Sequence, residues 1–300
     1  MRTLIAMLLF AAACSGCAVA PMVASGALSK MDWNDVQNIA TKVTKAADTQ
    51  RDLTEPEEIV LGGGIASNIL GAAPLWQDKK SQRYVQQVGQ WLALQTERAD
   101  LPWHFAILDD NEFNAFSTPG GYVFITRGML LAMRSEAELA GVLAHEIAHV
   151  VRKHQLLAMK KAAGKNVLFD FGSSILTVDP KVAAANPQLT PYLKKGISAG
   201  TEMYMRGLDK DDEFEADRMA VVIAARAGYD PYGLPAVLQS LQTVNPNYAG
   251  LALMFKTHPT FAARLDMLAL VMNEPFDKFE NQPALAPRFK SSVTFPKPSK

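Results

Sequence analysis

The chain has 300 residues, of which 49% are hydrophobic and 20% charged, a balance that excludes a fibrous or largely disordered protein and allows a sizeable core. Lysine and arginine together number 30, as do aspartate and glutamate, so the formal net charge is zero. No net positive field favours nucleic acid or an anionic membrane surface, and we therefore expect no nucleic-acid binding.

Residues 1–17, MRTLIAMLLFAAACSGC, have the pattern of an export signal. One arginine precedes an apolar run that is too short to span a bilayer, and small residues then lead to a cysteine. Both cysteines of the chain, Cys14 and Cys17, lie here, so the rest of the chain has no disulfide framework. Small residues before a cysteine resemble the lipobox of bacterial lipoproteins, in which that cysteine is acylated.

The alternative is ordinary signal cleavage after the "AVA" at 18–20, which Pro21 directly behind it disfavours. Cys17 leaves a signal of more usual length, whereas Cys14 follows three alanines, so Cys17 is preferred and Cys14 stays open. Neither cysteine is followed by aspartate, which in such lipoproteins implies delivery to the outer membrane. We expect a lipid anchor on the periplasmic side of that membrane, with a soluble periplasmic protein as the alternative.

Helical patterns come first along the mature chain. Residues 18–52 are predicted to form a linker and a helix, and residues 53–274 the main domain. Thr54 and Glu57 form a capping box at the start of a helix that the "GGG" at 62–64 interrupts. A further helix is predicted in 81–97, with one face made of Tyr84, Val88, Trp91 and Leu92.

Two strands follow, because 103–110 and 114–126 are rich in aromatic and β-branched residues. The "PGG" at 119–121 is either a kink in the second strand or a hairpin turn. One long helix is predicted over 135–164, with Ser135 and Glu138 as its capping box.

The later segments are a short apolar stretch after residue 165, a helix over 211–228, a helical pair that contains 257–270, and a tail. The apolar stretch is too short and too interrupted to cross a membrane. Residues 275–300 are proline-rich without apolar periodicity, and we expect a loose tail there.

A metal site is predicted in the long helix by the sequence HEIAH at 145–149. His145 and His149 are one helical turn apart and project from the same face, so both imidazoles can bind one ion. Glu146 is rotated by about 100° from His145, so it reaches a water on the metal more easily than the metal itself. That is the position of a general base.

A third ligand is expected because catalytic zinc is held by three protein ligands with one position open. The segment DDEFEAD at 211–217 offers Glu213, Glu215 and Asp217. Glu213 and Asp217 share a helix face and Glu215 points elsewhere. We expect Glu213 on the zinc, with Asp217 accepting the outer N–H of a ligand histidine.

The motifs HEIAHVVRKH, EFEAD, GYDP and THPTFAARL, in this order, resemble the zinc metallopeptidase family of the CAAX prenyl endopeptidases and HtpX, in its periplasmic BepA/LoiP-like branch. The resemblance runs from about Leu53 to Met272 and includes NAFSTPGGYVFITRGML before the motif helix. It implies an α+β fold, a mostly helical zincin of the gluzincin type with a small β-sheet beside the HExxH helix, and Glu213 as the third ligand. The membrane domains of the prenyl endopeptidases and the repeat domain of BepA have no counterpart, so the expected protein is a compact peptidase.

The expected activity is zinc-dependent endoproteolysis of unfolded or misassembled envelope proteins, with one Zn²⁺ per chain and substrate added as a strand along an exposed edge. A zinc-bound chaperone or assembly factor with little proteolysis is the alternative. The edge residues are expected to be Asn114, Ala115, Phe116, Gly120 and Gly121.

The three remaining histidines are His258, His154 and His104. The resemblance places His258 at the active site, where it either blocks the open metal position or stabilises the oxyanion. His154 comes five residues after His149 and is expected to face away from the ligand pair, so that it is structural, as is His104.

Overall fold

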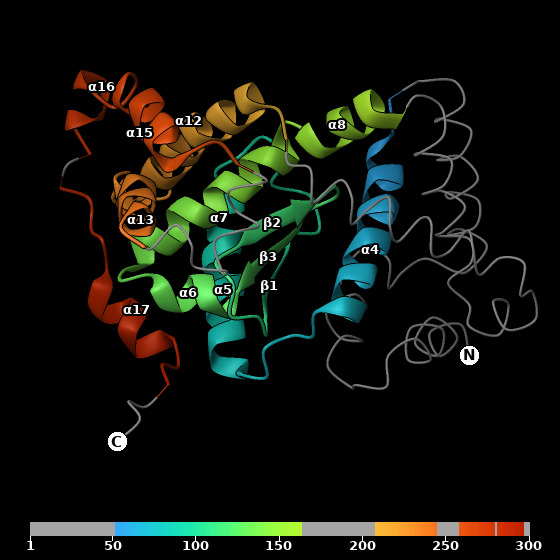
Figure 1. Cartoon of the computed structure of the whole chain (residues 1–300), viewed down its shortest axis with the longest axis horizontal. Helices are drawn as coiled ribbons and strands as arrows, with labels where there is room; N and C mark the ends of the chain where they lie inside the picture. Colours follow the sequence, from blue (N-terminus) through green and yellow to red (C-terminus); the bar gives the residue numbers. More distant parts are fainter. Residues whose placement is uncertain (1–51, 164–207, 245–257, 280, 297–300) are drawn as a thin grey trace, which may run out of the picture. The chain divides into compact units, whose positions relative to one another are not determined.

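The computed structural model describes residues 52–163, 208–244, 258–279 and 281–296 (Figure 1). The expected signal peptide, both cysteines, the expected helix within 18–52 and the apolar stretch after residue 165 lie outside these residues. The described residues fall into two compact units. Of the described residues, one unit contains 52–75, the turn Thr118–Tyr122 and 155–163, and the other contains Trp76–Ser117, Val123–His154 and those from 208 onward.

Helix α4 (Glu55–Ala72) belongs to the first unit and begins at the predicted capping box, in which the Thr54 amide donates to Glu57 Oε2 at 2.9 Å. The predicted interruption at 62–64 is wrong, because the helix continues through these glycines. A Cβ on Gly62 would lie 1.6 Å from the Pro119 carbonyl oxygen, so the missing side chain allows the turn 118–122 to approach the helix. Close packing, rather than helix termination, explains this glycine.

The sheet has three strands in the order β1-β3-β2: β1 (His104–Leu108), β2 (Ala115–Thr118) and β3 (Tyr122–Thr126). The predicted second strand is therefore a hairpin with its turn at the PGG segment, where Gly120 and Gly121 have φ of 77° and 97°. Glycine adopts these angles without steric cost. This arrangement leaves β2 at one edge of the sheet.

Helix α5 (Lys79–Ala93) contacts β1 and α7. Tyr84, Val88 and Leu92 are buried as predicted, but Trp91 is 49% exposed and does not belong to that face. Its indole nitrogen instead donates to the Ala227 carbonyl oxygen at 2.8 Å.

Helix α7 (Glu136–Val151) carries the HEIAH sequence and is buried along its whole length. It follows the short α6 (Arg127–Ala132) and begins at Ser135, whose hydroxyl accepts from the Glu138 amide at 3.2 Å. Figure 1 shows α7 running through the middle of the second unit, and it contacts α5, α12, α13 and α17. Polar side chains on such a helix must find partners inside the protein.

The predicted single helix over 135–164 is wrong, because α7 ends at Val151 and α8 (His154–Ala163) begins three residues later. Lys153 between them has a left-handed φ of 58°. That conformation cannot continue a right-handed helix, so the regular helix is interrupted here.

The remaining helices of the second unit are α12 (Lys210–Arg226), α13 (Gly233–Gln242), α15 (Phe261–Ala269), α16 (Glu274–Asp277) and α17 (Ala286–Ser292). The expected loose tail is wrong for the described residues, since Phe289 in α17 is fully buried and α17 contacts α5 and α7. Pro275 and Pro287 lie in the first turns of α16 and α17, where proline is compatible with a helix.

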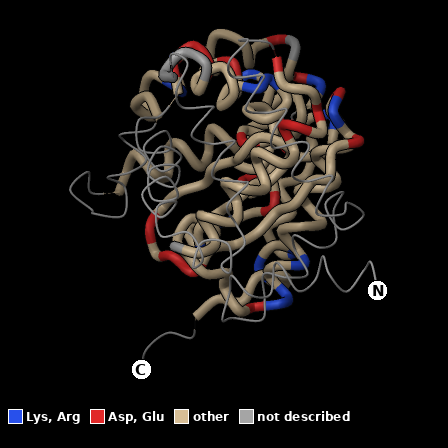
Figure 2. Tube along the Cα trace, turned by 90° about the vertical axis from the view of Figure 1, so that its right-hand side faces the viewer, with Lys and Arg blue, Asp and Glu red and all other residues tan. Residues whose placement is uncertain are grey.

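The described chain is a mostly helical α+β fold with a small sheet, as predicted for a zincin. Acidic and basic residues are interspersed along the described trace (Figure 2). In these described segments, none of the helices combines the length and the apolar character needed to cross a bilayer.

Candidate metal centre

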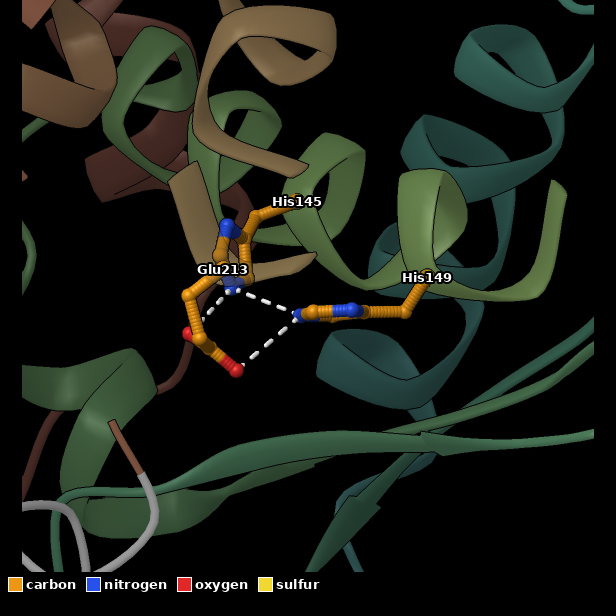
Figure 3. A group of neighbouring side chains, drawn as sticks. All are labelled: His145, His149 and Glu213. Atoms are coloured by element: carbon orange, nitrogen blue, oxygen red, sulfur yellow. Dashed lines mark hydrogen bonds and ion pairs between the residues drawn. The ribbon is translucent and has the colours of Figure 1, made fainter. Parts of the chain in front are cut away.

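Three buried side chains from two helices converge in the second unit (Figure 3). His145 and His149 come from α7 and Glu213 comes from the first turn of α12, and their candidate ligand atoms all lie within 4.8 Å of one another. The two Nε2 atoms are 3.0 Å apart, and the Glu213 oxygens lie 3.6 Å from His145 Nε2 and 3.5 Å from His149 Nε2.

This donor set fits a zinc ion. With ligand bonds of about 2.0–2.2 Å, neighbouring atoms of a tetrahedral shell are about 3.3–3.6 Å apart, which is close to the separations found here. Two imidazoles and one carboxylate leave a fourth position for water or substrate, as in catalytic zinc sites. His145, His149 and Glu213 would hold the ion.

Burial and neighbouring charges set the pKa of the two histidines in different directions. Burial lowers the pKa of His149 well below its ordinary value, which favours the neutral form that binds metals. Burial and Arg264 also lower the pKa of His145, but Asp217 and Glu213 outweigh them and raise it to about 9. A cation that binds here must therefore displace a proton from His145.

Glu146 lies beside the three ligands and is 3% exposed. Its Oε2 accepts a hydrogen bond from the Ser117 hydroxyl at 3.0 Å, and Ser117 belongs to β2. Burial raises the pKa of Glu146, and the charge of Glu213 adds to this, against opposing contributions from His145, His258 and Ser117. A carboxylate with a raised pKa is a better base near neutral pH, so the environment suits proton transfer.

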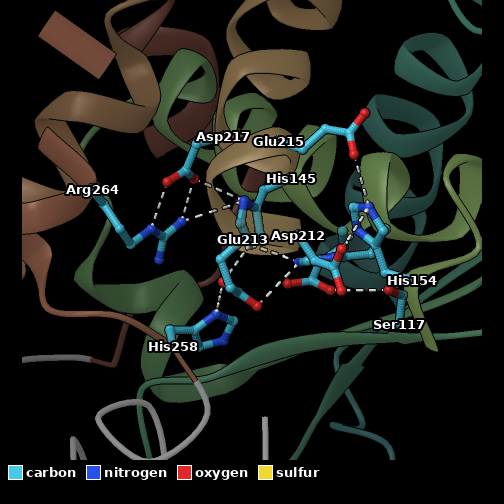
Figure 4. A network of polar contacts seen from close by, with 11 residues as sticks. Ser117, His145, His154, Asp212, Glu213, Glu215, Asp217, His258 and Arg264 are labelled. Atoms are coloured by element: carbon cyan, nitrogen blue, oxygen red, sulfur yellow. Dashed lines mark hydrogen bonds and ion pairs between the residues drawn. The ribbon is translucent and has the colours of Figure 1, made fainter. Parts of the chain in front are cut away.

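Asp217 fixes the orientation of His145 (Figure 4). Its Oδ1 lies 2.9 Å from His145 Nδ1, one helical turn beyond Glu213, as the shared helix face predicted. Arg264 from α15 donates to both Asp217 oxygens, with Nε at 2.8 Å and Nη2 at 2.6 Å. Although burial opposes it, this ion pair lowers the pKa of Asp217, so the carboxylate stays charged and holds the Nδ1–H tautomer of His145.

His258 contacts the third ligand. Its Nδ1 lies 2.5 Å from Glu213 Oε2, and its ring centroid is 5.8 Å from that of His145. Burial would raise the pKa of Glu213, but the charges of His258 and His149 and hydrogen bonds from His145 and His258 lower it well below its ordinary value. The structure thus places His258 at the ligand cluster, as the resemblance implied.

The prediction for His154 is wrong. Its Nδ1 lies 2.9 Å from Nδ1 of His149, and its Nε2 lies 3.3 Å from Glu215 Oε2. On a continuous helix, five residues correspond to about 500°, which would turn His154 by about 140° from His149. The break at Lys153 removes that geometry. His104 lies in β1 and is buried, and its structural role stays a prediction.

The residues expected to align substrate lie in two places. Ala115 and Phe116 belong to the edge strand β2, and Asn114 precedes it directly. Gly120 and Gly121 form the hairpin turn and are not part of a strand. The structure also adds Ser117 and Arg264 to the site. Arg264 is the lone arginine of the apolar helix FAARLDMLA, and that isolation is a signal for it in the sequence. Nothing in the sequence singles out Ser117.

Comparison with known proteins supplies independent information. Residues 79–270 match the family model described as "Peptidase family M48", and this match lies within the predicted domain 53–274. The "Beta-barrel assembly-enhancing protease" of Escherichia coli (strain K12) is 29% identical over 241 residues, which are 77% of this chain and 48% of that protein.

Mitochondrial proteins are also similar. The "Mitochondrial metalloendopeptidase OMA1" of Schizosaccharomyces pombe is 28% identical over 184 residues, covering 61% of this chain and 50% of that protein. The protein of the same name from Arabidopsis thaliana is 23% identical over 239 residues, covering 79% of this chain and 46% of its own length. The chain thus spans about half the length of these relatives.

Proposed function

The chain belongs to peptidase family M48, and from this premise we propose that it is a zinc-dependent endopeptidase that cleaves unfolded or misassembled proteins of the bacterial envelope. One observation carries the proposal. The two histidines of HEIAH and Glu213 meet within 4.8 Å, with the buried carboxylate of Glu146 next to them. This arrangement provides a cation site and a base at the same point.

The residues divide the chemistry between them. A Zn²⁺ bound by His145, His149 and Glu213 would polarise the scissile carbonyl and make a water molecule more acidic. Glu146 accepts the proton of the attacking water and later gives it to the leaving amine. Ser117 holds the Glu146 carboxylate in place for both steps, through the hydrogen bond of 3.0 Å.

An extended substrate segment would be aligned by strand addition. β2 is an edge strand of the sheet, and Ser117 joins it to the base, so a peptide bond presented along Asn114–Phe116 would lie close to Glu146. Main-chain pairing reads backbone and not side chains, so it suits unfolded segments of varied sequence. This supports unfolded proteins as the substrate class.

The envelope as the place of action rests on two observations. Relatives that carry the name "Beta-barrel assembly-enhancing protease" match 77% of this chain, and the N-terminal residues have the pattern of a lipoprotein signal. An acyl chain on Cys17, or on Cys14, would hold the protein on the periplasmic side of the outer membrane. Wild-type protein should then partition with membranes, and replacing both cysteines by serine should release it. An unmodified N-terminus on fully soluble wild-type protein would contradict the anchor.

His258 acts as a latch in this proposal. Its contact with the Glu213 carboxylate supports a position close enough to the ion to block water and substrate. His258→Ala should then increase the degradation of an unfolded substrate while zinc stays bound. A loss of activity greater than about tenfold with zinc retained would show instead that His258 stabilises the oxyanion.

The decisive experiment measures zinc content and casein cleavage for the wild type and for Glu146→Gln. We expect about one zinc per chain in both proteins, and at least about a hundredfold less cleavage in the variant, because the general base is lost. Zinc without cleavage in the wild type would support a zinc-bound chaperone instead. Full activity in the variant would show that Glu146 is not the base.

A further inference from the structure

We propose that His154 is a positioning residue for the metal ligand His149, accepting its outer N–H and thereby holding the ring in the orientation that binds the ion. This inference rests on the metal centre proposed above. It concerns the ligand His149, because Asp217 contacts the other ligand histidine, His145.

The two ligand histidines have different partners at their outer nitrogens. His145 Nδ1 lies 2.9 Å from a carboxylate oxygen of Asp217. His149 Nδ1 lies 2.9 Å from another imidazole nitrogen, Nδ1 of His154. A ligand histidine needs an acceptor at its outer N–H, because that hydrogen bond fixes its tautomer and ring orientation. His154 is in the place of that acceptor.

The surroundings of His154 are consistent with only one direction of these hydrogen bonds. If His149 binds the ion through Nε2, its proton is on Nδ1, and His154 must accept it with an unprotonated Nδ1. His154 then carries its own proton on Nε2. That nitrogen faces two carboxylates, Glu215 Oε2 at 3.3 Å and Asp212 Oδ1 at 3.8 Å, and a carboxylate can only accept.

From His154, the contacts continue through Glu215 to Arg152 at the protein surface. Glu215 Oε1 lies 2.7 Å from Nε of Arg152, and these two side chains are 32% and 48% exposed. His154, by contrast, is 1% exposed, and its ring packs edge-on against His149 with centroids 5.1 Å apart. The imidazole is therefore buried between the ligand and a half-exposed ion pair that holds its far nitrogen.

The backbone places His154 in this position by a specific irregularity. Lys153, with φ of 58°, ends the path of α7 and lets the first residue of α8 turn back toward His149. His154 accepts this hydrogen bond as a neutral imidazole. It therefore orients His149 without adding a second carboxylate besides Asp217, whose charge Arg264 already balances. Glu213 would then be the single anionic ligand of a bound Zn²⁺, which would keep the site electrophilic.

The test compares two substitutions that differ in the acceptor. In His154→Asn the amide oxygen can take the place of Nδ1, whereas His154→Leu has no acceptor. His104→Leu, at a buried histidine of β1, is the matched control for the loss of an imidazole from the interior. The dissociation constant for Zn²⁺ is measured by competition with a chelator, and the visible absorption spectrum of the Co²⁺-loaded protein reports ligand geometry.

We expect His154→Leu to raise the dissociation constant about 10- to 100-fold and to change the Co²⁺ spectrum. His154→Asn should stay within about threefold of the wild type, and His104→Leu should leave both measurements unchanged. Wild-type binding and spectrum in His154→Leu would overturn the proposal. So would equal losses in the Leu and Asn variants, or an equal loss in the His104 control.

If His154→Leu does not fold, the wild type decides the question. Side-chain ¹⁵N NMR of the zinc-loaded protein should show His154 as the Nε2–H tautomer, and an Nδ1–H tautomer would overturn the inference. Absence of zinc binding by the wild type is a separate outcome, which would overturn the proposed metal centre and this inference with it.

Discussion

Two of the buried glutamates of helix α7, Glu136 in its first turn and Glu146 beside the metal ligands, have opposite surroundings. Glu136 is 1% exposed and accepts from Tyr84 at 2.7 Å, from Tyr229 at 2.8 Å and from the guanidinium of Arg288. Glu146 is 3% exposed, and among the described residues its donor is the neutral hydroxyl of Ser117.

The different hydrogen-bond donors separate a glutamate that stabilises the fold from a glutamate that can transfer a proton. Two phenols and one guanidinium donate to the Glu136 carboxylate, so Glu136 ties α7 to α5 and α17. A carboxylate with one neutral donor in a buried site keeps a raised pKa, and Glu146 is therefore basic enough to take a proton. Burial alone does not distinguish the two roles, whereas the number and charge of the donors do.

The largest expected effect on stability follows from removing Glu136. Glu136→Ala leaves two buried phenols and Arg288 without their common acceptor, and should lower the free energy of unfolding by about 3 kcal/mol. Urea denaturation measures this, and casein cleavage per folded molecule should stay within about twofold of the wild type.

The control for Glu136→Ala is Glu146→Gln, which removes a charge from a site that disfavours it and should not lower the free energy of unfolding. If Glu136→Ala unfolds at the same urea concentration as the wild type, the role assigned to Glu136 is wrong.

A smaller effect is expected between the two glutamates, where α7 and α13 approach closely. A Cβ on Gly141 would lie 2.6 Å from the backbone nitrogen of Leu234, so Gly141→Ala should separate the helices and lower the free energy of unfolding by about 2 kcal/mol. Gly71→Ala in α4 is the matched control, because a Cβ there has no neighbour within 4 Å. Equal unfolding midpoints for the two variants would contradict the close crossing.

The smallest effect per side chain concerns alkaline pH. Burial and the hydrogen bond to Glu136 raise the pKa of both Tyr84 and Tyr229. Their contribution to stability is complete below pH 10, the value for an unfolded tyrosine, and falls as the pH rises above it, by about 1.4 kcal/mol per phenol at pH 11. Unfolding curves at pH 9 and 11 measure this loss.

The matched variants separate these phenols from other alkaline effects. Replacing Tyr84 and Tyr229 together by phenylalanine should reduce the loss between pH 9 and 11, and Tyr232→Phe, at an exposed tyrosine, should not. An unchanged pH dependence in the double variant would show that these phenols do not carry it.

Much of the metal centre could be predicted because it depends on helical spacing. His145 and His149 at i and i+4, and Glu213 and Asp217 at the same interval, share faces wherever the segments are helical. Capping boxes at Thr54 and Ser135 similarly marked the helix starts, since they depend on three neighbouring residues.

The sequence-based predictions are wrong in two situations. One is a helical period continued through a break, as over 135–164, and the other is glycine or proline taken as a sign that regular structure ends. The glycines at 62–64 predict an interruption of α4, because the packing of Gly62 against Pro119 depends on a segment distant in the sequence. The prolines near the C-terminus were read as signs of a loose tail, although proline in the first turn is compatible with the short helices α16 and α17.

The sequence by itself thus determined the ligand types, their spacing and the base, because an α-helix converts intervals of three or four residues into shared faces. Tertiary structure alone decided which groups surround them. Ser117 reaches Glu146 from a strand, Arg264 reaches Asp217 from another helix, and His154 reaches His149 only because Lys153 takes a left-handed conformation. Contacts between distant segments depend on how whole elements pack, and single backbone irregularities redirect side chains that periodicity would place elsewhere.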